Sequence, residues 1–245
     1  MSKKPQPVIG IVSGIGPLAG SDVLTKVFAY AAYEYGVHDD AEYPDVILLN
    51  HGIGVDNMAS LNDSFKKGII SLTRDIESYG ATIIGIACNT AHAYLGEIVF
   101  NSPNTKIVDL IDSVANTVKD LDPGSTIRYG LLTSRGTRDS HLYRKYLNSY
   151  GVKCVEATNK QQALLDETID LIMSHKNKRA KAKIGVVIDQ MRDKGIDHFI
   201  AGCTELPIAL SGGINGANIV DSNWVLAKTL VDLYYTNVGR KSIRE

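Results

Sequence analysis

The chain of 245 residues contains few cysteines, no long apolar run and almost no net charge. Its three cysteines are an odd number without regular spacing, which excludes a disulfide framework. No stretch approaches the ~18 apolar residues of a membrane-spanning helix, and the first residues lack the apolar core of a signal peptide. A formal net charge of -1 provides neither a basic surface for nucleic acid nor a polybasic membrane signal. We therefore expect a cytoplasmic protein with reduced thiols that binds neither nucleic acid nor membranes.

What remains is the composition of an ordinary globular protein, with 44% hydrophobic and 22% charged residues. Short apolar runs alternate with helix-length amphipathic segments, a pattern typical of parallel sheets and an α/β fold. The predicted strands are 8–12, 45–50, 82–87, 106–109, 128–132, 152–155, 197–201 and 218–220. The predicted helices are 18–36, 60–79, 91–100, 111–120, 138–150, 161–174, 178–194, 206–211 and 222–236. Helix starts are indicated by Pro17, Asn62-Asp63, Asp112, Thr137 and Asp221-Ser222.

The chain repeats itself over a domain-sized period. The segment from Gly10 to Gly16 and the segment from Gly130 to Gly136 share one pattern: Gly, two apolar residues, Ser or Thr, two residues, then Gly. Such self-similarity indicates two related α/β halves. We expect a first half at 1–110 and a second half at 111–217, with 218–245 packing back on the first.

Cys88 and Cys203 stand in similar segments, one in each half. Each has a Gly eight residues earlier, an apolar run of strand length, and small polar residues after it. The pattern places each thiol at the C-terminal end of a buried strand, where ligands bind in open α/β sheets. We expect a helix N-terminus after each cysteine to lower its thiol pKa from ~8.5 toward neutrality. Cys154, within a predicted strand, fits a structural cysteine instead.

A matched pair of thiols suits proton transfer better than redox or metal chemistry. The two cysteines do not form C-x-x-C, and no third metal ligand is evident near Cys88 and His92. Proton transfer on opposite faces of one carbon requires two groups of matched acidity related by local two-fold symmetry, which a duplicated fold supplies. The carbanionic transition state must be stabilised electrostatically. The available donors are backbone N–H groups of the loops around Gly16, Thr90, Gly136 and Thr204.

The segment from Gly14 to Ala19 has the G-x-G-x-x-A spacing of a dinucleotide-binding loop. The next strand ends in Asn50, where such a site has an acidic residue, and Pro17 removes one backbone N–H. A small loop that binds a carboxylate is therefore favoured over an NAD site.

Three charged residues near these loops allow more than one interpretation. Arg135 and Arg138 flank Gly136 and could clamp a carboxylate bidentately, or they could be surface charges. Glu205 could orient the Cys203 thiol or take part in proton transfer. It could equally be a first-turn carboxylate without a chemical role.

The segments Ile11 to Ala19, Cys88 to His92 and Gly202 to Pro207 together resemble the aspartate/glutamate racemase superfamily, most closely the cofactor-independent aspartate racemases. The resemblance implies two pseudo-symmetric doubly wound α/β subdomains with parallel sheets facing a central cleft. It also implies no pyridoxal phosphate or other cofactor, no metal, and homodimers. Cys88 and Cys203 would be the catalytic pair. The substrate-binding residues would be Gly16, Asn50, Asn89, Thr90, Ala91, Thr137, Thr204 and Glu205.

The chain departs from the family pattern where the substrate side chain would bind. Asn57 replaces the Arg expected for a distal carboxylate, the Glu-Gln pair of the family appears as Gln161-Gln162, and Lys176 is the candidate for a further expected Lys. The substrate is therefore expected to be aspartate or a related acidic amino acid, with glutamate and a broader range left open. The alternatives are a maleate-type isomerase or decarboxylase of the same superfamily, or a non-catalytic protein that binds acidic amino acids.

Overall fold

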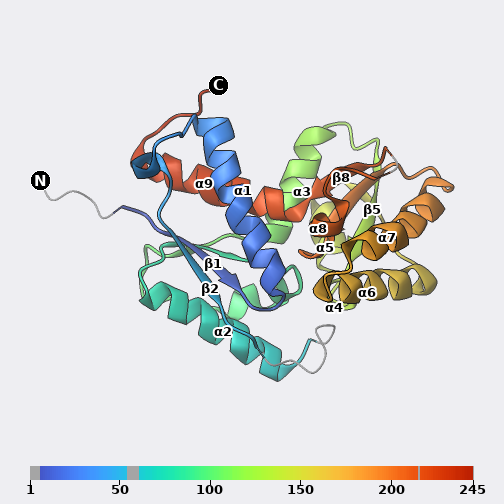
Figure 1. Cartoon of the computed structure of the whole chain (residues 1–245), viewed down its shortest axis with the longest axis horizontal. Coiled ribbons are helices and arrows are strands. Elements are labelled where there is room, and N and C mark those ends of the chain that lie inside the picture. Colours follow the sequence, from blue (N-terminus) through green and yellow to red (C-terminus); the bar gives the residue numbers. More distant parts are fainter. Residues whose placement is uncertain (1–5, 54–60, 215, 245) are drawn as a thin grey trace, which may run out of the picture.

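Two four-stranded parallel sheets with equivalent strand orders form the frame of the molecule (Figure 1). The structure, a computed structural model, describes residues 6–53, 61–214 and 216–244. The first sheet has the order β2-β1-β3-β4 and comprises β1 (Ile9–Ser13), β2 (Val46–Asn50), β3 (Ile83–Ile86) and β4 (Lys106–Ile107). The second has the order β6-β5-β7-β8 and comprises β5 (Arg128–Thr133), β6 (Lys153–Glu156), β7 (His198–Gly202) and β8 (Asn218–Asp221). The predicted α/β fold with parallel sheets is confirmed.

Helices cover both faces of each sheet. In chain order they are α1 (Pro17–Tyr35), the 3₁₀ helix η1 (Asp40–Glu42), α2 (Asp63–Ser78), the 3₁₀ helix η2 (Thr90–Glu97), α3 (Leu110–Leu121), α4 (Arg135–Asp139), α5 (Leu142–Ser149), α6 (Asn159–Met173), α7 (Asn177–Arg192), α8 (Leu206–Leu210) and α9 (Ser222–Val238). Alternate side chains of a strand point to opposite faces. Ile9 and Ile11 of β1 therefore belong to the core beneath α1, whereas Val12 belongs to the core beneath α2.

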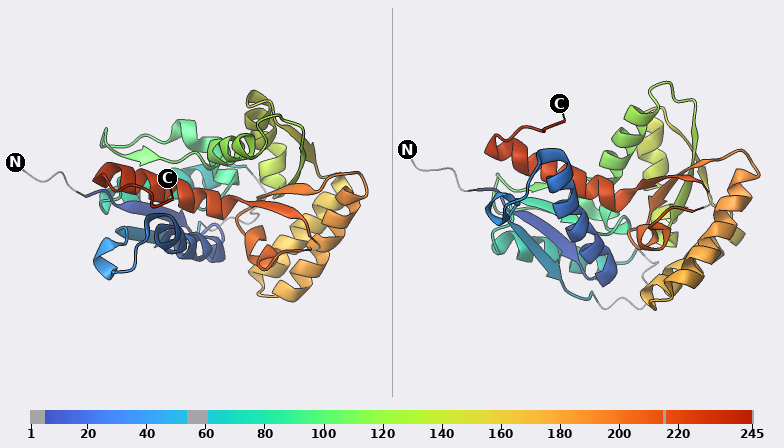
Figure 2. Two further views of the ribbon diagram at one scale, coloured as in Figure 1. Left: turned by 90° about the horizontal axis from the view of Figure 1, so that it is seen from above. Right: turned by 45° about the horizontal axis from the view of Figure 1, so that its top comes forward.

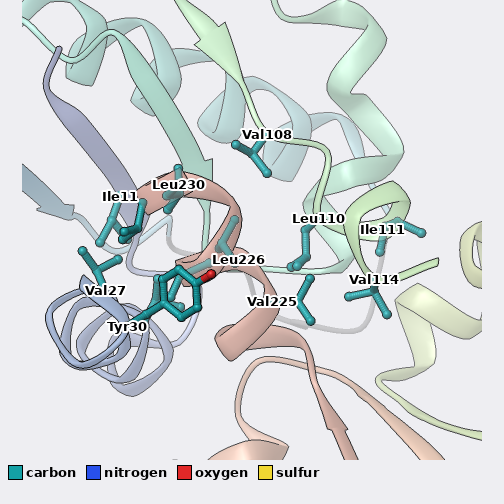
Figure 3. Close-up of a cluster of buried hydrophobic side chains, with 14 of the residues drawn as sticks. Ile11, Val27, Tyr30, Val108, Leu110, Ile111, Val114, Val225, Leu226 and Leu230 are labelled. Atoms are coloured by element: carbon teal, nitrogen blue, oxygen red, sulfur yellow. The ribbon is translucent and has the colours of Figure 1, made fainter. Parts of the chain in front are cut away.

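The last helix, α9, joins the two halves. It starts directly after β8 of the second sheet and runs beside α1 of the first half, as both views of Figure 2 show. Its residues Val225, Leu226 and Leu230 pack in one buried cluster with side chains of β1, α1 and α3 (Figure 3). The same cluster includes Tyr129 and Leu131 of β5, one of the two central strands of the second sheet. One apolar core thus extends across both halves.

The strand at 218–221 differs from the expected arrangement. The sequence placed 218–245 with the first half, but β8 pairs in parallel with β7 in the second sheet. The helix that follows it packs against α1, and Asp221 at the end of β8 forms an ion pair with Lys26 of α1 at 2.7 Å. The division of the chain into two subdomains at 110 stays a prediction.

Two predicted helices also differ from the structure. The segment predicted as a helix at 91–100 is the 3₁₀ helix η2, because the carbonyl oxygen of Cys88 accepts from the His92 ring (2.8 Å) while the His92 backbone N–H donates to Asn89 (3.1 Å). The helix predicted at 138–150 is two helices, α4 and α5. His141 between them is in the left-handed conformation, with φ 54°, which interrupts the helical hydrogen bonds.

Candidate active site

The two thiols occupy equivalent places in the two sheets. Cys88 follows β3 and Cys203 follows β7, and each of these strands is one of the two central strands of its sheet. In this strand order the crevice beyond the carboxyl ends of the strands is where ligands bind. Both thiols line one cavity of about 30 Å³. Its lining residues are Ile15, Cys88, Asn89, Thr90, Ser134, Ile169, Cys203, Thr204 and Glu205.

Glu205 connects the second thiol to the first half. The Cys203 Sγ donates to Glu205 Oε2 at 3.0 Å. The other carboxyl oxygen, Oε1, is buried without a hydrogen-bond partner. A Cβ atom added to Gly16 would lie 1.8 Å from this oxygen, and Gly16 has φ 122°. Gly16 therefore provides both a backbone conformation and a space that other residues would not.

Three hydroxyl groups meet on the other side of the cavity. Thr90 Oγ1 lies 3.0 Å from Ser134 Oγ and 2.9 Å from Thr137 Oγ1, and the Ser134 and Thr137 hydroxyls are 3.0 Å apart. Ser134 also caps α4 by accepting from the Thr137 backbone N–H (3.3 Å). The cluster joins η2 of the first half to α4 of the second, so the predicted proximity of the two loops is present.

Asn89 and Thr204 are fixed by buried hydrogen bonds. Tyr143 donates its hydroxyl to Asn89 Oδ1 at 2.6 Å, and Thr204 Oγ1 donates to the Ala87 carbonyl oxygen at 3.1 Å. The carbonyl oxygen of Thr204 accepts from Asn223 Nδ2 at 2.8 Å. Each of these bonds orders a loop that follows a central strand.

The expected lowering of the thiol pKa values is wrong for this structure. Burial and, after it, the nearby Glu205 carboxylate raise the pKa of Cys88 to about 12. Burial and Glu205 also raise the pKa of Cys203. The helices after the cysteines are a 3₁₀ helix and a five-residue helix, so their N-terminal N–H groups do not offset the loss of water around the thiols. Both cysteines are therefore neutral thiols near neutral pH.

The His92 ring is hydrogen-bonded to the backbone of Cys88. The His92 Nδ1 donates to the Cys88 carbonyl oxygen at 2.8 Å, and burial lowers the pKa of His92, which keeps the ring neutral. Within the described residues, three side chains of metal-ligand type lie close together at His38, Asp39 and Glu42. None of these three residues lines the cavity.

The remaining candidate site residues do not line the cavity where the structure describes them. Asn50 is exposed at the end of β2, where its Oδ1 accepts from Ser13 at 3.1 Å, and Ala91 is buried but does not line the cavity. Arg135 is paired with Asp166, and Arg138 with Asp139. Lys176 is exposed before α7 and does not line the cavity. Asn57 lies outside the described residues.

Sequence reasoning missed Ile15, Ser134, Ile169 and Tyr143. Ser134 follows β5 directly, so its place after a central strand was the available signal. Ile169 of α6 lines the cavity, Tyr143 of α5 is hydrogen-bonded to the lining residue Asn89, and nothing local in the sequence marks either of them. Gln161 and Gln162 have structural contacts: Gln161 forms a capping box with Thr158, and Gln162 donates to the Thr133 carbonyl oxygen at 3.0 Å.

Comparison with known proteins identifies the family. The family model described as Asp/Glu/Hydantoin racemase matches residues 12–230. The chain belongs to this family. The predicted class of activity, an amino-acid racemase and hence an isomerase, is confirmed. The resemblance stated from the three motifs is confirmed as well.

Individual relatives cover nearly the whole chain. The broad-specificity amino-acid racemase RacX of Bacillus subtilis (strain 168) is 27% identical over 228 residues, which span 93% of this chain and 98% of that protein. An aspartate racemase of Picrophilus torridus has 25% sequence identity and a TM-score of 0.79, with 93% of this chain and 94% of that chain covered. The glutamate racemase RacE1 of Bacillus anthracis has 14% identity and a TM-score of 0.70 over 98% of this chain and 85% of its own, and so shares the fold. No helix in the described part of the chain is long and apolar enough to cross a membrane.

Proposed function

We propose that this protein racemises α-amino acids without a cofactor, with Cys88 and Cys203 transferring protons on opposite faces of Cα. In the reacting form, one cysteine has lost its proton to solvent and is a thiolate. This thiolate removes the Cα proton, the thiol across the cavity delivers its own proton to the reverse face, and the two cysteines thereby exchange protonation states. The observation that carries the proposal is that both buried thiols line one cavity from equivalent strand ends of two sheets with equivalent order.

The size of the cavity adds a conformational step. About 30 Å³ accommodates one or two water molecules, which is less than an amino acid occupies. Because the lining comes from both halves, we propose that the halves move apart to admit the substrate and close again around it. Closure then excludes water from the carbanionic transition state, where backbone N–H groups of the strand-end loops stabilise the developing charge.

For the substrate we propose aspartate or a related acidic amino acid, within a broader range of amino acids. The Picrophilus torridus relative is an aspartate racemase, whereas RacX of Bacillus subtilis is described as broad in specificity. The replacement of the expected Arg by Asn57 supports the broader range. We also propose a homodimer, to be tested by analytical ultracentrifugation; a cytoplasmic location stays a prediction.

The test is incubation with single enantiomers in deuterium oxide, without added cofactor. The panel contains both enantiomers of aspartate, glutamate and alanine. We expect deuterium at Cα and formation of the opposite enantiomer from at least one of these amino acids. Absence of exchange with the whole panel would contradict racemisation.

Single substitutions test the role of the two thiols. We expect Cys88→Ser and Cys203→Ser each to abolish racemisation, since each removes one member of the pair. Cys154→Ser is the matched control, because Cys154 is a free, half-buried thiol on β6 that does not line the cavity. Full activity in either cavity variant would overturn the two-thiol assignment.

A further inference from the structure

The two halves of the site carry different chemical groups at one equivalent position. Thr90 stands two residues after Cys88, and Glu205 stands two residues after Cys203. Each reaches across the cavity to the opposite half: Thr90 contacts Ser134 and Thr137, and Glu205 lies against Gly16. The same place in the repeat therefore holds a neutral hydroxyl on one side and a carboxyl group on the other.

A racemase requires this kind of asymmetry. Its two proton-transfer groups mirror each other across Cα, but the other groups on Cα include a carboxylate and an ammonium, which are opposite in charge. A site with equal halves would not distinguish these two groups. Hydroxyl groups can donate hydrogen bonds to the substrate carboxylate, and a carboxyl group can accept charged hydrogen bonds from the ammonium.

We infer that Glu205 Oε1 binds the α-ammonium group of the substrate and so restricts the site to α-amino acids. This inference rests on the proposed function. Glu205 is the carboxyl group among the described lining residues, and no Lys, Arg or His is among them. The side chain is 4% exposed, and Oε1 has no hydrogen-bond partner within the described residues. An unsatisfied carboxyl oxygen buried at a cavity wall costs free energy that a bound cation recovers.

The position of the second carboxyl oxygen agrees with this assignment. Oε2 accepts from the Cys203 thiol at 3.0 Å, and that thiol is one of the two groups that face Cα in the proposed reaction. The ammonium nitrogen is bonded to Cα. One carboxyl group thus contacts both the thiol and the amine of the carbon on which the thiol acts.

Substrate binding then changes the acidity of the thiols. Burial and, after it, the Glu205 charge raise the pKa of both Cys88 and Cys203, while burial raises the pKa of Glu205 itself, so the charged form of this carboxyl group gains from a bound cation. An ammonium bound at Glu205 compensates that charge, which makes the thiolate more accessible once an α-amino acid is bound. A dicarboxylate without an amine, the substrate class of a maleate-type isomerase, has no ammonium to compensate the Glu205 charge and so gains no such effect.

Binding of amine-containing and amine-lacking partners tests the inference. Calorimetry on the full-length protein compares L-aspartate with succinate and L-alanine with propionate. We expect the wild type to bind the amino member of at least one pair at least ~10-fold more tightly, as a hydrogen bond between charged groups provides. Glu205→Gln should weaken the binding of that amino acid at least ~10-fold. It should change the affinity of the amine-lacking partner by less than about 3-fold.

Two further variants separate amine binding from a structural role. Thr90→Val should weaken the binding of both members of a pair by a similar factor, because both members carry the carboxylate. Glu205→Asp keeps the charge with a shorter reach and should retain a preference for the amino member. Three results would each overturn the inference. They are equal weakening of the binding of both members by Glu205→Gln, no amine preference in the wild type, and no binding of any of the four compounds. Loss of deuterium exchange with the amine preference intact would contradict racemisation and leave the Glu205 assignment standing.

Discussion

The hydroxyl of Thr204, in the loop after β7, donates to the carbonyl oxygen of Ala87, directly before Cys88, at 3.1 Å. Thr204 is 2% exposed and Ala87 is 1% exposed, so this bond between the two halves is made away from water. It connects the segment that carries one thiol to the segment that carries the other.

Thr204→Val should therefore destabilise the protein and impair catalysis. The substitution leaves the Ala87 carbonyl oxygen without this donor, which costs about 1–3 kcal/mol in the free energy of unfolding. Urea denaturation measures this loss, and kcat with the best substrate of the panel measures the effect on the thiols. Thr204→Ser keeps the hydroxyl and should stay near wild type. Wild-type stability of Thr204→Val, or a loss in Thr204→Ser as large as that in Thr204→Val, would contradict the assigned role of the hydroxyl group.

Gly16→Ala should reduce kcat/KM by about 100-fold, the effect of displacing a reacting group by about 1 Å. The new Cβ would lie 1.8 Å from Glu205 Oε1, so the carboxyl group or the loop must shift. Gly213→Ala is the matched control, because Gly213 also has positive φ (77°) but has nothing within 4 Å of the added Cβ. Both variants should lose stability through backbone strain, of about 1–3 kcal/mol each. Steady-state kinetics should separate them; similar activity in the two variants would contradict the contact with Glu205.

Tyr143→Phe should lower both stability and activity. The buried Tyr143 hydroxyl donates to Asn89 Oδ1 at 2.6 Å, and its removal leaves that oxygen unpaired at a cost of about 1–3 kcal/mol. Tyr150→Phe removes a hydroxyl that donates to Asp112 at 2.9 Å on a half-buried residue, where water replaces the bond, so its effect should be smaller. Thermal unfolding of the two variants provides the comparison. A larger loss in the Tyr150 variant would contradict the assigned role of burial.

Cys88 should make the protein sensitive to alkaline pH. Burial raises its pKa from 9.0 to about 12, so the folded state retains a proton that the unfolded state releases. This contribution to stability is complete below pH 9 and is lost as pH rises from about 9 through about 12. Subtracting the unfolding free energy of Cys88→Ser from that of the wild type at each pH isolates the thiol from other titrating groups. A difference that does not change across this range would contradict the burial of Cys88 as a neutral thiol.

The sequence predicted the parts of the fold that depend on local apolar pattern. All eight strands appear, because each is a short apolar run, and Pro17, Asn62 and Asp221 mark helix starts as expected. Asp112 and Thr137 were wrong as helix starts, since Asp109 and Ser134 provide the caps. In both cases several residues of suitable type are adjacent, and only the backbone conformation decides which of them accepts the hydrogen bond.

The cavity-lining residues that directly follow strand ends could be predicted from the sequence. The properties that depend on burial could not. Asn89, Thr90, Thr204 and Glu205 line the cavity together with both thiols, as the repeated segments indicated. The direction of the thiol pKa values was wrong because the sequence shows a following helix but not how completely water is excluded. Ile169 and Tyr143 come from other helices, and their approach to the site is a property of the tertiary packing.

The course of α9 has a consequence for any attempt to divide the protein. A cut in the turn at 122–126 would give two pieces of similar size, each with its own four-stranded sheet. The first piece would lack the helix that covers α1, and the second would carry that helix with its apolar side uncovered. The two pieces would have to be produced together and assemble by the insertion of α9. The halves of the repeat are therefore no longer separable as independently folding proteins.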